Sequence, residues 1–123
     1  MMLRTALTAL AAMTLAACMG TEAPAPVTVP EPAPIVVDFS QIEQRTPGDV
    51  IAYLGEPTLV RRDDTVQVML FEAAGCVFEV VFFEPDNGDY FRAHHYSART
   101  RTGSDTDPQL CARQLLESRV NTP

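Results

Sequence analysis

The chain has 123 residues, of which 16 are Asp or Glu and nine are Arg, with no Lys, and its formal net charge is −7 at pH 7. A short acidic chain lacks the clustered basic residues with which proteins hold nucleic-acid phosphates or anionic lipid surfaces. The composition therefore argues against nucleic acid as a partner, and the length predicts one small domain.

The N-terminus has the pattern of a bacterial lipoprotein signal peptide. Arg4 precedes an apolar run that ends with two alanines in front of Cys18. The run is too short to cross a bilayer as a helix, so we expect residues 1–17 to be a cleaved signal peptide and Cys18 to carry the acyl chains that anchor the protein. Met19 differs from the Asp of an inner-membrane retention signal, which favours the outer membrane. The alternative is an ordinary signal peptide in which the cysteine falls at this position by chance.

Residues 18–35 read as a tether between the lipid and a folded domain. This stretch contains prolines at positions 24, 26, 30, 32 and 34 and shows neither helical nor alternating periodicity. Proline removes backbone donors and favours extended polyproline II, so the tether is expected to stay solvated. The folded domain is then expected to occupy residues 36–123 and to face the periplasm.

Two helices are expected at the start of this domain. Residues 38–45 have apolar side chains three apart and could form a short helix. Thr46 is a stronger helix start, because it is followed by Pro at the first helical position and by Asp49, which can bond back to the cap. Gly55 suits the end of this helix, and Pro57 prevents it from continuing.

After the helix the apolar period changes to two, which predicts strands over 58–62, 65–72, 76–84 and 89–101. The 76–84 strand is apolar on both sides, so we expect it at the centre of the sheet, with a helix on one face and the other face partly covered. The predicted fold class is α+β, with a short N-terminal helix or helices packed on a three- to four-stranded antiparallel sheet. Residues 102–106 are expected to form a polar loop.

A final amphipathic helix is expected over 108–120, with Asp107 as its cap, and it contains Cys111. Cys76 and Cys111 are the two thiols left once Cys18 is acylated, and the envelope is an oxidising compartment. A disulfide would fasten the last helix to the central strand. The alternatives are a redox-active pair, or a metal site completed by His94 or His95.

The pattern Val50, Leu54, Gly55 and Pro57, followed by hairpin strands and an apolar strand, resembles the SmpA/OmlA family of small outer-membrane lipoproteins. The likeness covers roughly residues 40–99. It implies one or two N-terminal helices on a three-stranded antiparallel sheet, behind a lipobox and a flexible tether. Members of the family stabilise envelope assemblies, among them the outer-membrane β-barrel assembly machine, and are not enzymes.

The sequence contains no clear catalytic group and suggests no cofactor. It has neither a G-x-S-x-G elbow nor a glycine-rich phosphate loop. His94 and His95 are adjacent, and on a regular strand adjacent side chains point to opposite faces, so they are expected not to share one metal ion. Glu79 lies within the most apolar strand and could pair with Arg92 or Arg99 across the hairpin.

A protein-binding surface is the site that the sequence favours. Alternation along the 89–101 strand places Tyr90, Arg92, His94 and Tyr96 on one face, and aromatic residues and Arg are enriched at interfaces. The alternative is that these side chains pack within the domain. We therefore expect a non-enzymatic outer-membrane lipoprotein that acts through protein contacts in envelope or outer-membrane protein assembly, with the barrel-assembly machine as a possible partner. The alternative function is a small inhibitor or ligand-binding module.

Overall fold

The computed structural model describes Gly20 and residues 22–122. One compact unit runs from Pro32 to the C-terminal end, and the described residues before it are exposed and contain neither helix nor strand. The expected signal peptide, 1–17, and the expected lipid-bearing Cys18 lie outside the described residues. None of the helices in the described ranges has both the length and the apolar character needed to cross a membrane.

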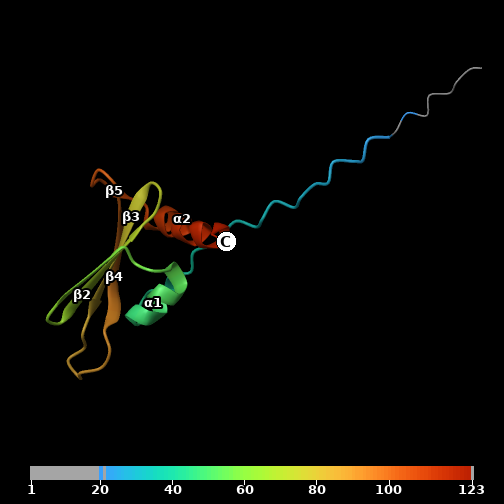
Figure 1. Cartoon of the computed structure of the whole chain (residues 1–123). Coiled ribbons are helices and arrows are strands. Elements are labelled where there is room, and N and C mark those ends of the chain that lie inside the picture. Colours follow the sequence, from blue (N-terminus) through green and yellow to red (C-terminus); the bar gives the residue numbers. More distant parts are fainter. Residues whose placement is uncertain (1–19, 21, 123) are drawn as a thin grey trace, which may run out of the picture. The chain divides into compact units, whose positions relative to one another are not determined.

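The folded unit combines helices with a single antiparallel sheet (Figure 1). In chain order its elements are η1 (Phe39–Gln41), α1 (Pro47–Leu54), β1 (Leu59–Asp63), β2 (Val66–Glu72), β3 (Cys76–Phe83), β4 (Arg92–Thr100), β5 (Asp105–Thr106) and α2 (Pro108–Asn121). The strands are ordered β1-β2-β3-β4-β5, so each strand pairs with its neighbours in sequence. The predicted α+β class and the C-terminal helix are confirmed.

Two details of the prediction are wrong. The sheet has five strands, because residues of the expected polar loop form β5 and pair with Ala98 and Arg99 of β4. The expected helix over 38–45 is only the single 3₁₀ turn η1, which Asp38 caps by accepting a hydrogen bond from the Ser40 amide. A segment this short has too few backbone hydrogen bonds to propagate as an α-helix.

Helix α1 begins and ends at the residues that the sequence indicates. Thr46 and Asp49 form a capping box, in which the Thr46 side chain accepts from the Asp49 amide and the Asp49 carboxylate accepts from the Thr46 amide. At the other end Gly55 has φ 102° and ψ −175°, a conformation that only glycine adopts readily. The chain can therefore leave the helix and enter β1 within a few residues.

Both helices cover the same face of the sheet (Figure 1). The core between them contains Val50 and Leu54 from α1 and Leu115 from α2, packed on alternate residues of the central strands. The buried residues of β3 are Cys76, Phe78, Val80 and Phe82.

A disulfide joins Cys76, at the start of β3, to Cys111 in the first turn of α2. The two Cα atoms are 5.8 Å apart, and the residues are 35 positions apart in sequence. Both cysteines are buried, with 3% and 0% of their surface exposed. The expected disulfide is therefore present, and it fastens the last helix covalently to the central strand.

Candidate functional site

No described segment of the folded unit covers the face of the sheet opposite the helices. We call this face the open face. Directly paired residues in an antiparallel sheet share a face, so the register assigns each side chain. None of the residues on this face is buried. They are Leu59, Arg61 and Asp63 of β1, Val66, Val68, Leu70 and Glu72 of β2, Val77, Glu79, Val81 and Phe83 of β3, and Arg92, His94, His95, Ser97 and Arg99 of β4.

The centre of the open face is apolar. Three of the four outward residues of β2 and three of the four outward residues of β3 are apolar. Phe83 has 42% of its surface exposed, and Leu59 at the edge has 52%. A one-sided antiparallel sheet ordinarily turns polar side chains to water, and a continuous apolar patch marks an interaction site. We call Val66, Val68, Leu70, Val77, Val81 and Phe83 the apolar stripe.

Charged side chains flank the apolar stripe on both sides. Arg61 and Asp63 lie on β1, and Arg92 and Arg99 lie on β4. The Nη1 atom of Arg99 is 3.7 Å from Oε2 of Glu79, so the expected pairing of Glu79 across the hairpin is made with Arg99. The open face therefore has an apolar centre and a rim of mixed charge, the arrangement typical of a protein-binding surface.

A β-bulge in β4 separates the residues that the sequence placed on one face. Val81 pairs with His95 and Phe82 with Ala93, so His94 is the extra residue. The alternation of side chains reverses at this point. Arg92 and His94 lie on the open face, where the His94 ring meets the Phe83 ring edge-on at 5.6 Å. Tyr96 lies on the face that carries the helices.

Tyr96 is part of the packing between the sheet and the N-terminal segment. Its ring stacks on Phe39, with centroids 4.7 Å apart, and on Phe78, with centroids 5.9 Å apart. Its hydroxyl donates to Oε1 of Glu43 at 3.1 Å. Burial, and then the hydrogen bond and negative charge of Glu43, raise the pKa of Tyr96 above its usual value of 10.0. The prediction of a shared surface is therefore wrong for this residue.

Tyr90 precedes β4, with 76% of its surface exposed. It lines a shallow, mainly apolar hollow beside Phe91 and the first residues of α1, Pro47 and Gly48. Tyr90 is therefore separate from both the open face and the Tyr96 packing.

The bulge also changes where the two histidines lie relative to the sequence prediction. Both His94 and His95 are exposed, and both belong to the open face, so they do not point to opposite sides. Cys76 and Cys111 are joined in the disulfide. Within residues 20 and 22–122, no three His, Cys, Asp or Glu side chains are grouped so that they could hold a metal ion.

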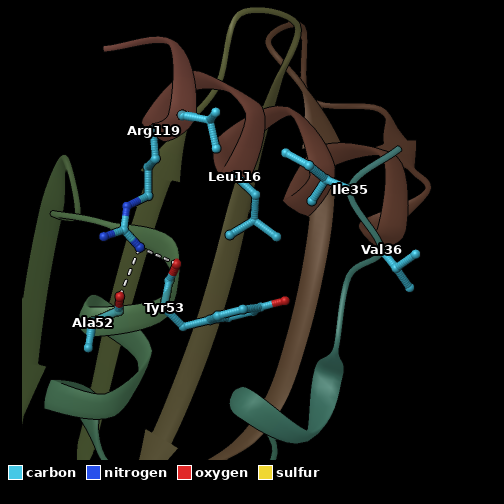
Figure 2. A pocket seen from close by; sticks show the side chains of 7 residues that line it. Ile35, Val36, Ala52, Tyr53, Leu116 and Arg119 are labelled. Atoms are coloured by element: carbon cyan, nitrogen blue, oxygen red, sulfur yellow. Dashed lines mark hydrogen bonds between the residues drawn. The ribbon is translucent and has the colours of Figure 1, made fainter. Parts of the chain in front are cut away.

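A groove lies between α1, α2 and the segment that leads into the domain (Figure 2). Its volume is about 510 Å³, and its walls include Ile35, Leu116, Val120 and the ring of Tyr53. Arg119 reaches across it from α2, and its Nη1 donates to the carbonyl oxygens of Ala52, at 2.8 Å, and of Tyr53. These contacts satisfy carbonyls that the end of α1 leaves unpaired. The groove is therefore a helix–helix junction with an apolar opening to solvent.

Two carboxylates near the start of the fold are held in their charged form. Hydrogen bonds from Ser40 lower the pKa of Asp38 below its usual value of 3.8, and hydrogen bonds from Thr46 do the same for Asp49. Both groups cap a helix or turn, so these pKa shifts reflect local structure and give no sign of acid–base catalysis.

None of the family models, curated proteins and solved structures compared with the chain matches it. Its function is therefore inferred from the residues and the geometry of the described part of the chain.

Proposed function

We propose that this protein is a non-enzymatic lipoprotein, anchored through Cys18 in the outer membrane, whose periplasmic domain binds protein through the open face. The observation that carries the proposal is the apolar stripe, because six outward side chains of the two central strands are apolar and unburied. Apolar surface of this kind gains free energy when a partner removes it from water.

The sequence supports the location. The lipobox pattern ending at Cys18 suits a lipid anchor, and the proline-rich stretch up to position 35 suits a spacer between membrane and domain. The disulfide between Cys76 and Cys111 suits an oxidising compartment. The likeness to SmpA/OmlA lipoproteins makes the assembly and maintenance of outer-membrane proteins the favoured process, and the barrel-assembly machine the first partner to test.

The experiment places a photo-crosslinking phenylalanine analogue at Phe83, where it replaces an aromatic ring on the open face. A matched control places the analogue at Leu110, which has 50% of its surface exposed but lies on α2. Irradiation in the native envelope should give a protein adduct from position 83 and none from position 110. Equal labelling at both positions, or no adduct from position 83, would refute the proposal. The intact mass of the purified protein reports separately whether Cys18 is acylated.

A second candidate function is the binding of a small ligand in the groove between α1 and α2. The observation in its favour is a volume of about 510 Å³ with apolar walls and one guanidinium, which falls within the range of small-molecule sites. Long-chain carboxylates, which match an apolar wall and one cation, are the probes to use. Thermal stabilisation by such a probe that is lost in Leu116→Arg would support ligand binding, and an unchanged melting temperature would rule it out.

A further inference from the structure

We propose that the occupant of the open face is a second copy of this chain, packed face to face about a two-fold axis that runs parallel to the strands between β2 and β3. This inference rests on the proposed function, because it uses the same face. It follows from the order of charges and apolar groups across the sheet.

The register sets the open-face side chains in rows across the strands. One row contains Asp63, Val66, Phe83 and Arg92, from β1 to β4. The next row contains Arg61, Val68, Val81 and His95. Each of these two rows therefore has two apolar side chains in the middle and a polar or charged one at each end. The third row, which contains Leu59, Leu70, Glu79 and Ser97, instead has the Glu79 carboxylate in its middle, paired with Arg99 of the same chain.

Rotation by 180° about an axis parallel to the strands keeps each row at its level and reverses its order. β1 of one copy then faces β4 of the other, and β2 faces β3. Asp63 comes opposite Arg92 of the second copy, and Val66 comes opposite Phe83. In the next row Val68 comes opposite Val81 and Arg61 opposite His95, and in the third row Leu70 comes opposite Glu79. Aligned sheets in β-sandwiches pack in this way, with their strands within about 30° of each other.

The other possible axis fits less well. A two-fold axis at right angles to the strands, through the second row, would place β1 of each copy over β1 of the other. Arg61 would then face Arg61, and Asp63 and Arg92 would face Leu59 and Ser97 instead of each other. Glu79 faces an apolar side chain with either axis and does not distinguish them. Like charges in contact oppose association, so the charge pattern selects the axis parallel to the strands.

The size of the face determines how strong the contact can be. Four strands about 4.8 Å apart and about seven residues long cover roughly 450 Å² in projection. Counted on both copies this is about 900 Å², which is below the roughly 1,200–2,000 Å² of stable specific complexes and corresponds to a weak, transient contact. Two copies held on one membrane by lipid anchors would have a raised effective concentration, which compensates for a weak contact.

The test uses the full chain, expressed with its N-terminal segment in a Gram-negative envelope and extracted in mild detergent. Two differently tagged copies are produced together, and recovery of one tag with the other is measured. Asp63→Arg alone should reduce recovery at least about fivefold, as should Arg92→Asp alone, because each places like charges opposite each other twice. The double variant should return to within about twofold of the wild type. Glu117→Arg, an exposed charge reversal on α2, should have no effect.

Each outcome separates this inference from the proposed function. Loss in both single variants with recovery in the double variant supports the dimer. If the charge reversals do not change the recovery of one tag with the other, the copies associate through another surface and the inference is overturned. If the tags do not co-purify but the probe at Phe83 crosslinks to a different protein, the inference is wrong and the proposed function stands. Absence of both co-purification and any crosslink overturns both.

Discussion

Removing the disulfide should cost this domain a large part of its stability. Cys76→Ala combined with Cys111→Ala opens a covalent loop between residues 35 positions apart. The chain-entropy relation gives about 4 kcal/mol for a loop of this size at 25 °C. A folded unit of this length has a free energy of unfolding of roughly 5–14 kcal/mol, and a loss of 4 kcal/mol corresponds to a fall in melting temperature of roughly 20 °C.

Urea denaturation followed by circular dichroism measures this loss directly. Alanine is chosen because serine would bury a hydroxyl at two sites that are 3% and 0% exposed, and that cost would be added to the loop effect. Wild-type protein reduced with a thiol provides the control, and it should lose a similar amount. A loss below about 1.5 kcal/mol in both samples would show that the disulfide is not a main source of stability and that packing alone holds α2 on the sheet.

Four further predictions concern single side chains. Gly55→Ala should lower the free energy of unfolding by about 1–3 kcal/mol, because φ at this position is 102° and the new Cβ would lie 3.3 Å from Cδ of Arg119. The control is Gly48→Ala, where the nearest atom to the new Cβ is 3.9 Å away, and this variant should melt near the wild-type temperature. Thr46→Ala should lower the free energy of unfolding by about 1 kcal/mol in urea, while Thr46→Ser should leave it nearly unchanged. Because the pKa of Asp49 is lowered in the fold, its contribution is present above pH 4 and is lost as the pH falls through the folded-state pKa; Asp49→Asn should remove that part of the acid dependence. Because the pKa of Tyr96 is raised in the fold, its contribution to the free energy of unfolding should be constant below pH 10 and should fall as the pH rises through the folded-state pKa. Melting temperatures measured over a series of alkaline pH values test this, and the same fall in Tyr96→Phe would contradict the assignment to Tyr96.

Local signals in the sequence were sufficient for much of the fold. The Thr46 cap, the following proline and Gly55 predict α1 to within a residue at each end, since they act on the backbone of the helix itself. The disulfide between Cys76 and Cys111 is the favoured alternative from the sequence, because these are the two thiols left when Cys18 carries the lipid. β5 could not be foreseen, since Asp105 and Thr106 have no strand pattern and are held only by pairing with β4.

The candidate site was predicted less well, and the bulge in β4 is the reason. A strict period of two puts Tyr90, Arg92, His94 and Tyr96 together, but one inserted residue reverses the faces from there on. A signal did exist in the sequence: Ala93 and Ala98 are the small residues suited to packing beneath helices, and their odd spacing of five fits a shared face only if the strand contains an extra residue.

The sequence contains only a weak indication of the open face. The 76–84 strand is apolar on both sides, and that pattern predicts two covered faces. The described helices cover only one of them. Sequence periodicity reports that a side chain prefers to leave water, but it does not report whether the same chain or another molecule provides the cover. The identity of the covering surface is therefore a question for experiment.

The groove in Figure 2 brings the start and the end of the domain side by side. Ile35 and Val36, on the segment that leads into the fold, line it together with Leu116 and Val120 near the end of α2. A tag or second domain fused after α2 would therefore emerge beside the incoming segment, on the helix side of the sheet, and leave the open face accessible. A short linker could also join the two ends directly, with new termini cut at the exposed turn around Gly88, to give a circularly permuted chain with the same sheet and the same disulfide.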